Sequence, residues 1–505
     1  MVYPGARSTG CALCRKRKIK CDERRPGCRR CELHNAPCPG YDRPLDIRFH
    51  DGPHAAVQSK PAAVETPGYN GMAVSSLISP ANTHSSAAST VGASPTRPLA
   101  TLYQPRTIWD DAAMCYFLRE YFVDAQPGVM SGHLDFLPDL LFDSSEESAL
   151  RPAVLASACL CFSRYKKHND LYARARDHYG KALLAVSTAI SSSPDSWGDD
   201  ILAAIMLLHM FEDVDGVSGS AASHLKGIAR LYDARGQNLL AKIPGSSLFA
   251  WIFTNLQIHC MATREVFKCL TIPEPEPIVT DSVAGLVFSV AKISRFCAAM
   301  WDQYTAIHVD KVPPENQRGA LMAVVHLAVR TKSETDSWAA SLPKWWQPKT
   351  VHRDGNRRLI TYPNRWMAVI VTMYLTSLVK FFDSVIFCCQ TILDFRLCCT
   401  PEEEALVSST AANAKERQPH LIQKICESIP YACGEINVEG EQLPLPDYKG
   451  SSSYNLIWPL SLVAFYKGSA EAQVAYSKAT LARIETLYGI GLVQSAQRMA
   501  SMVFY

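Results

Sequence analysis

Six of the chain's 18 cysteines lie within the 28 positions from residue 11 to residue 38, in the segment CALCRKRKIKCDERRPGCRRCELHNAPC. Their positions repeat, because each of the first three is followed 17 residues later by another. The pairs are Cys11 and Cys28, Cys14 and Cys31, and Cys21 and Cys38. Each half is therefore the same unit, C-x2-C-x6-C, and the repeat predicts a small module with internal twofold character.

Metal binding is the interpretation of this segment that its surroundings favour. The N-terminus, MVYPGARSTG, has no apolar stretch of the kind found in signal peptides, so a reducing compartment is expected, in which disulfide frameworks are rare. Leu13, Ile19 and Leu33 are too few to form a hydrophobic core. Bound metal would therefore supply the folding free energy, about 10 kcal/mol or more for structural zinc.

The number of cysteines indicates how many metal ions are bound. A structural zinc ion takes four ligands in a tetrahedron, whereas each half offers three thiolates. Two zinc ions need eight ligand positions, which six cysteines fill if two sulfurs bridge the ions, and the symmetric solution takes one bridge from each half. We therefore expect two Zn²⁺ ions held by Cys11, Cys14, Cys21, Cys28, Cys31 and Cys38. We expect His34, the histidine inside this span, to be a surface residue.

Basic residues are concentrated around these cysteines. Residues 1–44 contain eleven Lys and Arg and four Asp and Glu, a net charge of +7, whereas the whole chain carries +3. Two Zn²⁺ and six thiolates sum to −2, so the cluster needs cationic surroundings. We expect each C-x2-C pair to begin a short helix, with residues 15–20 continuing the first one. A basic helix of this kind fits the major groove of DNA and attracts its phosphates.

This segment resembles the binuclear zinc cluster of fungal Zn2Cys6 transcription factors. All six cysteines match, as do the run RKRKIKCD and Pro26 in the loop between the halves. The resemblance covers about 40 of 505 residues. It implies that the first helix of the module lies in the major groove and reads a CGG triplet.

The same resemblance assigns roles to individual residues. It makes Cys11 and Cys28 the bridging ligands. It implies that Lys18, with Arg17 beside it, reads the bases, and that Arg15 and Lys20 lie along the phosphates. Arginine can bond guanine O6 and N7 in a bidentate manner, so Arg17 would favour G.

The rest of the chain divides into two parts by composition. We place the zinc module at residues 7–43 and a disordered linker at 44–106, because eight prolines fall between Pro44 and Pro105 and no apolar period is visible. These prolines exclude a coiled coil after the module, so the sequence leaves dimerisation and half-site spacing open.

Residues 107–505 are expected to form a large all-α domain. Apolar residues recur at helical spacing in TIWDDAAMCYFLREYFVDA and DDILAAIMLLHMFEDVDG, and glycine ends SAASHLKGIARLYDARG. The leucine-rich helix from Ile201 and the stretch from His224 to Gly236 are similar to the regulatory domain of the same fungal family. That resemblance implies a small-molecule effector or a co-regulator protein as a further partner.

Two other classes of protein are disfavoured by the sequence. The longest apolar run, from Trp366 to Val379, is shorter than the roughly 20 residues that a bilayer span needs, so we interpret it as a buried core helix and expect no membrane partner. The motifs G-x-S-x-G, H-E-x-x-H, G-x-G-x-x-G and the P-loop are absent. We expect the pairs Cys388–Cys389 and Cys398–Cys399 to be small buried residues and His209 to be a core histidine.

The sequence therefore predicts a nuclear transcription regulator of genes transcribed by RNA polymerase II. It would bind double-stranded DNA, reading CGG-like triplets through the zinc module, and would not be an enzyme. Two alternatives stay open: a metal-sensing or storage protein, against which the run RKRKIK argues, and a helical enzyme that the zinc module targets.

Overall fold

The structure is a computed structural model of the whole chain. It divides into two compact units, Met1–Thr96 and Arg97–Tyr505, which are described separately below. The predicted linker, 44–106, lies outside the described residues, and its boundaries stay a prediction. The residues described are 11, 13–14, 17, 19–22, 24, 28–34, 38, 109–124, 132–145, 147–191, 198–216, 221–234, 246–263, 267, 270, 282–353, 357–491 and 493.

The N-terminal unit is built on two short helical segments. Leu13 and Cys14 are helical, and the second segment is α2 (Arg29–Glu32). Among the described residues of this unit, all the buried ones are cysteines. The described residues of this unit therefore form no apolar core apart from the cysteines.

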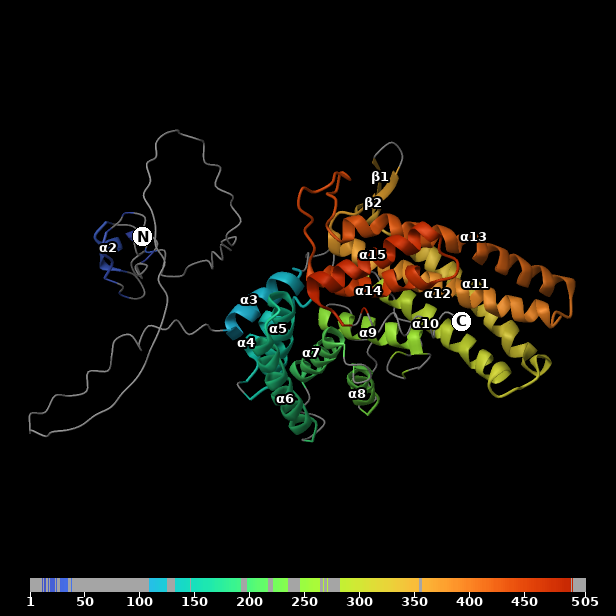
Figure 1. Ribbon diagram of the computed structural model, residues 1–505, viewed down its shortest axis with the longest axis horizontal. Coiled ribbons are helices and arrows are strands. Elements are labelled where there is room, and N and C mark those ends of the chain that lie inside the picture. Colours follow the sequence, from blue (N-terminus) through green and yellow to red (C-terminus); the bar gives the residue numbers. More distant parts are fainter. Residues whose placement is uncertain are drawn as a thin grey trace, which may run out of the picture. The chain divides into compact units, whose positions relative to one another are not determined.

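The second unit is a helical body. Figure 1 shows helices α3 to α6 at one end of the body and the tips of α12 and α13 at the other. The predicted fold class, a zinc module with a large all-α domain, is confirmed. The helices of the body are α3 (Trp109–Tyr121), α4 (Leu137–Asp143), α5 (Leu150–Lys166), α6 (Asn169–Ser191), α7 (Asp199–Asp215), α8 (Ala221–Ala234), α9 (Ser247–Thr263), α10 (Ser282–His308), α11 (Arg318–Ser341), α12 (Arg365–Asp394), α13 (Pro401–Ala432), α14 (Gly450–Phe465) and α15 (Glu471–Tyr488).

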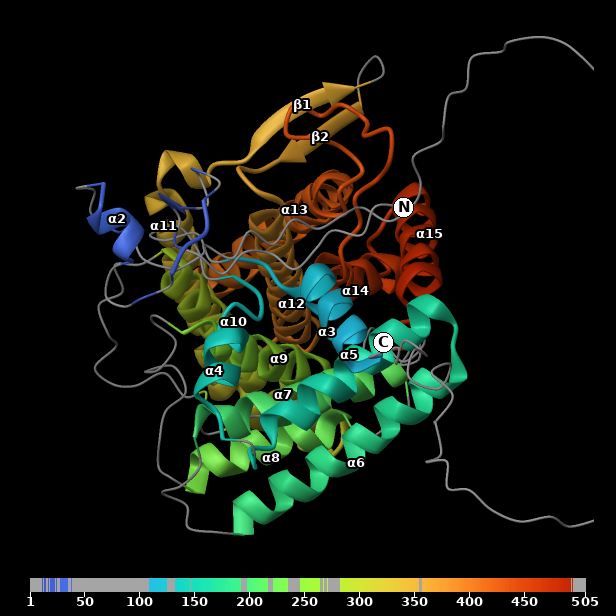
Figure 2. The ribbon, with the colours of Figure 1, turned by 90° about the vertical axis from the view of Figure 1, so that its left-hand side faces the viewer.

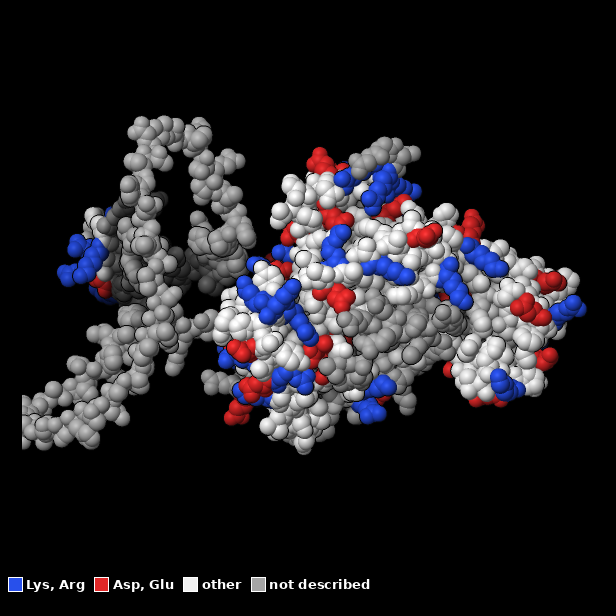
Figure 3. Space-filling model, in the orientation of Figure 1, with Lys and Arg blue, Asp and Glu red and all other residues white. Residues whose placement is uncertain are grey.

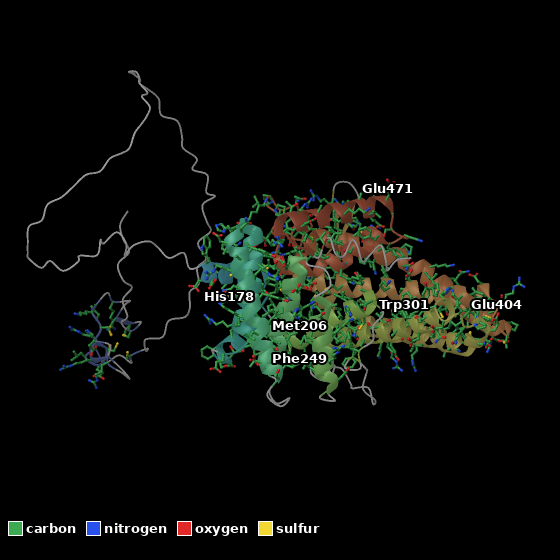
Figure 4. The ribbon with its side chains drawn as sticks, turned by 60° about the horizontal axis from the view of Figure 1, so that its bottom comes forward. His178, Met206, Phe249, Trp301, Glu404 and Glu471 are labelled. Atoms are coloured by element: carbon green, nitrogen blue, oxygen red, sulfur yellow. The ribbon has the colours of Figure 1, made fainter. Side chains whose placement is uncertain are left out.

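Helix α7 lies in the middle of the core. Every side chain from Ile201 to Val214 is buried, as expected of a helix that is apolar on all sides. Asp199 and Asp200 in the first turn stabilise its N-terminus, because their negative charge faces the positive end of the helix dipole. Helices α5, α6 and α8 pack against α7. Figure 2 shows α5 and α6 side by side next to α7. Figure 4 labels Met206 on α7 and Phe249 on the neighbouring stretch of α9.

Helices α12 and α13 form a long helical hairpin. Asn364 caps α12 by accepting a hydrogen bond from the N–H of Met367 at 2.7 Å. Thr400 caps α13 through the N–H of Glu403 at 3.2 Å, and Pro401 follows at the first helical position. Among the described residues, α12 is the one helix long and apolar enough to cross a membrane, with a mean hydropathy of 1.6 over its best window. Because 61% of that window is buried against the rest of the body, α12 is a core helix.

A short antiparallel hairpin interrupts the helices, although strand-like alternation is scarce in the sequence. Strands β1 (Lys349–Arg353) and β2 (Arg357–Thr361) pair, with Val351 opposite Leu359. Two 3₁₀ turns, Pro314–Gln317 and Lys344–Trp346, precede it. Of the two tryptophans in the second turn, Trp346 is buried and Trp345 is 41% exposed.

Two glycines bring the C-terminal part of the chain against the end of α7. Gly216 ends this helix in the left-handed conformation, with φ +77°, and its N–H bonds the carbonyl of Glu212 at 2.9 Å. Gly491 donates its N–H to the carbonyl of Val214, also at 2.9 Å. A Cβ on Gly491 would lie 2.3 Å from the Cα of Gly216, so only glycine fits there.

We therefore predict that Gly491→Ala destabilises the body by about 1–3 kcal/mol, because the added methyl group forces two backbones apart. Denaturant unfolding of the whole chain measures the effect. Gly180→Ala is the matched control, since nothing lies within 4 Å of its Cβ position on helix α6. It should stabilise the chain by roughly 0.5–1 kcal/mol. Equal effects of the two substitutions would contradict this account of the contact.

Candidate metal centre

The two halves of the N-terminal unit share one local geometry. The Sγ of Cys11 accepts a hydrogen bond from the N–H of Cys14, and the Sγ of Cys28 accepts one from the N–H of Cys31, each at 3.4 Å. In both halves the first sulfur therefore caps a helical turn that carries the second. These two hydrogen bonds fix each first sulfur against the backbone of its helical turn.

The six sulfurs lie together in the centre of the unit, where Figure 4 shows their yellow sticks. They form two groups of four, and within each group all the sulfurs lie within 4.8 Å of one another. Cys11 and Cys28 belong to both groups, joined by Cys14 and Cys21 in one and by Cys31 and Cys38 in the other. His34, by contrast, is exposed and belongs to neither group.

The distances between sulfurs fit zinc. Sγ–Sγ distances of 3.7 Å join Cys11 to Cys28, Cys11 to Cys31, and Cys14 to Cys28. Four sulfurs placed about 2.3 Å from a tetrahedral zinc ion would lie about 3.8 Å apart. A disulfide would need about 2.05 Å, so these pairs are not joined covalently. The donors thus suit two tetrahedral sites that share an edge.

Of the four residues expected to contact DNA, two can be located. Arg17 and Lys20 are described and exposed, whereas Arg15 and Lys18 lie outside the described residues. The predicted C-terminal end of the helix over residues 15–20 is wrong. The N–H of Arg17 bonds the carbonyl of Leu13, but the N–H of Ile19 reaches back five residues to Cys14, a bond that ends a helix. Ile19 and Lys20 therefore lie beyond the helical turn.

Comparisons with known proteins match a part of each unit. The model of the fungal Zn(2)-Cys(6) binuclear cluster domain matches residues 9–47, and that of the fungal specific transcription factor domain matches residues 116–283. The chain therefore contains a fungal Zn2Cys6 cluster domain and, after it, a fungal specific transcription factor domain. The cofactor of its cluster domain is a pair of zinc ions, and six cysteines gather at the place that this requires.

Curated relatives match short segments of the chain. Arginine metabolism regulation protein II of Saccharomyces cerevisiae is 65% identical over 34 residues, which are 7% of this chain and 4% of that protein. The Zn(2)-C6 fungal-type transcription factor afumD of Aspergillus fumigatus is 49% identical over 53 residues, 10% of this chain and 14% of its own. The aspercryptin biosynthesis cluster-specific transcription regulator atnN of Emericella nidulans is 51% identical over 37 residues, covering 7% and 6%. The chain thus spans a small part of each relative's length. No solved structure matches it.

Electrostatics shows why the cluster domain needs its metal. Burial, together with hydrogen bonds to the neighbouring thiols of Cys11 and Cys28, raises the pKa of the Cys14 thiol to about 12. The pKa of Cys31 is raised for the same reasons. Without a cation these sulfurs would hold their protons. Two Zn²⁺ ions reverse that preference, because the coordinating thiols are deprotonated by the charge of the metal.

One side chain that joins the two halves was not singled out from the sequence. Asp22 accepts a hydrogen bond from the backbone N–H of Arg29, at the start of α2, at 3.2 Å. Desolvation opposes its ionisation, but hydrogen bonds from backbone N–H groups, that of Arg29 first, lower its pKa overall. Asp22 follows Cys21 directly, so it ties one half to the helix that carries Cys31. Its place in the run RKRKIKCD was the available signal.

The body holds a third group of candidate ligands, Asp110, Cys159 and His178. Arg174 already pairs with Asp110 through two hydrogen bonds of 3.1 and 2.9 Å, so a cation is in place there. The other cysteines agree in part with expectation. Cys388 and Cys389 are buried, whereas Cys398 is half-buried and Cys399 is exposed.

The shared sulfurs generate a prediction about metal content. Cys11→Ala or Cys28→Ala should lose both zinc ions, because each sulfur belongs to both groups of four. Native mass spectrometry of the whole chain measures the stoichiometry. Cys115→Ala, at an exposed cysteine of the body, should keep two ions per chain. Two bound ions in the Cys11 variant would contradict the shared-edge geometry.

The contact of Asp22 generates a second prediction. Asp22→Ala should keep two zinc ions per chain but release them to a chelator roughly tenfold faster, because a group that orients the metal-binding helix is lost. Asp22→Asn retains an acceptor oxygen, so its rate of zinc release should lie between those of the parent chain and of Asp22→Ala. The release rate is followed with a colorimetric zinc indicator. Unchanged release in Asp22→Ala would show that this hydrogen bond does not hold the halves together.

Proposed function

We propose that this chain regulates transcription by binding double-stranded DNA through its zinc cluster domain. The observation that carries the proposal is the placement of charge around the sulfurs. The sulfur-rich centre of the unit is buried, while every described basic residue of the unit is exposed. These residues are Arg17, Lys20, Arg24, Arg29 and Arg30. A small rigid unit with a cationic exterior suits a phosphate backbone.

The metal would hold the unit in the conformation that binds DNA. In this proposal the ligands are the six cysteines, and Cys11 and Cys28 bridge the two ions. Their membership of both groups of four sulfurs supports the bridging role. The zinc ions supply the folding energy of the domain and take no part in chemistry. The mechanism is therefore binding and not catalysis.

Specific and non-specific contacts would fall to different residues. Lys18 and Arg17 would contact base edges of a CGG-like triplet, and Arg15 and Lys20 would contact phosphates. The turn that ends before Ile19 supports this division, because it limits the helical surface to residues near Arg17. Lys20 then leaves the helix and can follow the backbone of the duplex. Phosphate contacts give affinity that depends on salt but not on sequence.

The helical body would act as the regulatory part of the protein. Its surface differs from that of the zinc unit, because blue and red side chains are interspersed over the face seen in Figure 3. A surface of mixed charge favours neither DNA nor a membrane. Within this proposal the protein works in the nucleus, and the body responds to a small-molecule effector or a co-regulator protein.

The proposed division of contacts is tested by two substitutions in the full chain. Lys18→Ala should cost about 1–3 kcal/mol of binding to CGG-containing DNA and little on scrambled DNA. Lys20→Ala should weaken binding to both sequences alike and reduce the slope of log K against log salt by about 1. Both variants should keep two zinc ions. Fluorescence anisotropy at several salt concentrations measures all of these quantities.

Equal loss on the two DNA sequences in the Lys18 variant would contradict its role in reading bases. A chain that binds zinc fully but shows no affinity for DNA would favour the alternative of a metal sensor. Removal of zinc with a chelator separates these cases, because the DNA-binding proposal requires affinity to disappear with the metal and to return when zinc is restored.

A further inference from the structure

The body contains a cavity that the proposed DNA contacts do not use. It has a volume of about 100 Å³ and lies where α9, α10, α12 and α14 meet the segment at Gly132 and His133. Most of its wall is apolar or aromatic. The aromatic side chains that line it are His133, Trp251, Phe253, Trp366, Tyr374 and Trp458. A largely apolar cavity with a few polar groups is the usual form of a small-molecule site.

Several polar atoms in the cavity wall have no hydrogen-bond partner among the described residues. The Nε2 of His133, the Nε1 atoms of Trp251 and Trp458, and both side-chain polar atoms of Gln257 are buried in this condition. The His133 and Gln257 side chains are 3% and 2% exposed. Buried polar groups in native proteins nearly always find partners, so an unpaired set in one cavity wall needs an explanation.

The polar groups around α7 show that this body can satisfy such atoms. Tyr454 donates its hydroxyl hydrogen to Asp213 at 2.5 Å, and the hydroxyl of Tyr179 bonds Glu212. These groups lie as deep as those of the cavity but are paired within the chain. Unpaired buried atoms also occur elsewhere in the described body, but five of them, from four residues, belong to the lining of this one cavity. Their gathering there favours a partner from outside the chain.

The residues of the cavity wall also indicate which net charge the ligand carries. None of the described residues that line it is an Asp, Glu, Lys or Arg. Burial lowers the pKa of His133 to about 3, so its imidazole is neutral at physiological pH. A charged molecule would lose its hydration there without gaining an ionic partner. The site therefore suits a neutral molecule.

The arrangement of the aromatic rings in the wall indicates the shape of the ligand. The imidazole of His133 lies 5.1 Å from the ring of Trp366 and 5.8 Å from that of Trp251, with an interplanar angle of 87° to the latter. These rings present flat walls on different sides. Space of this size takes one flat ring, and the rest of a larger ligand would lie at the open mouth of the cavity.

We propose that this cavity binds a neutral, planar, largely apolar ring compound that carries a carbonyl or hydroxyl group. The two indole N–H groups and the amide of Gln257 would donate hydrogen bonds to its oxygen, and the amide oxygen would accept one from a hydroxyl. The walls come from α9, inside the matched regulatory domain at 116–283, and from helices that follow it in sequence. The ligand would thereby join these parts of the body. Binding at the cavity is independent of the DNA-binding proposal.

Two matched probes test the chemistry of the site by calorimetry on the full-length, zinc-loaded protein. Coumarin is neutral and planar and carries a carbonyl group, whereas coumarin-3-carboxylate adds a negative charge to the same rings. We expect coumarin to bind with one site per chain and to raise the melting temperature, because it binds the folded state alone. The carboxylate should bind at least tenfold more weakly.

Two variants test the location. Gln257→Leu should weaken coumarin binding about tenfold, because it removes the amide that contacts the ligand, while the free protein melts no lower than the parent. Ala250→Phe fills the cavity from α9 and should abolish binding. Gln418→Leu is the control, since Gln418 is also buried but bonds the carbonyl of Val379 at 3.4 Å, away from the cavity wall. It should leave coumarin binding unchanged.

Three results would overturn the proposal. They are absence of coumarin binding to the folded parent protein, equal affinity for the two probes, and coumarin binding that survives both Gln257→Leu and Ala250→Phe. If coumarin binds as expected but the chain shows no affinity for DNA, the cavity proposal stands and the proposed function fails. If the chain binds DNA as proposed but does not bind coumarin, the proposed function stands and the cavity proposal fails.

Discussion

Coordination of metal by thiolates is the interaction on which the N-terminal unit depends. Its described buried residues are all cysteines, so no apolar core could hold it together. Burial raises the pKa of Cys14 and Cys31, and only a nearby cation makes the buried thiolate form favourable. The same cations fix the backbone on which the exposed Arg17 and Lys20 are carried. In the proposed function, affinity for zinc and affinity for DNA are therefore coupled through folding.

The body is stabilised in a different way, by one continuous hydrophobic core. Helix α7 is buried on all sides, and the chain returns to it from far away in sequence. Tyr454 bonds Asp213 in this helix, and Gly491 bonds the carbonyl of Val214 at its end. These contacts join the region matched by the fungal specific transcription factor domain to the C-terminal part of the chain. The body therefore folds as one unit, although the family model covers residues 116–283 alone.

Much of this organisation can be predicted from the sequence. The repeat of cysteines predicted two metal ions, and the sulfur geometry agrees with two four-sulfur groups that share Cys11 and Cys28. The apolar run after Trp366 predicted a core helix, because its length falls short of a bilayer and its neighbours are charged. The predicted helix over 15–20 extended too far along the chain, because nothing in RKRKIK indicates that the helical turn ends before Ile19. The hairpin at 349–361 carried no clear alternation and was missed.

The sequence by itself determined the chemistry of the zinc unit, because ligand type and spacing act over a few residues and coordination geometry leaves few alternatives. It also determined that the rest would be helical, since a period of 3.6 residues is a local property. Only the tertiary structure decided which polar atoms of the body stay unpaired. His133, Trp251, Gln257 and Trp458 lie far apart along the chain, and no local pattern links them. They meet because the packing of four helices leaves a space between them, and such a space is a property of the assembled core.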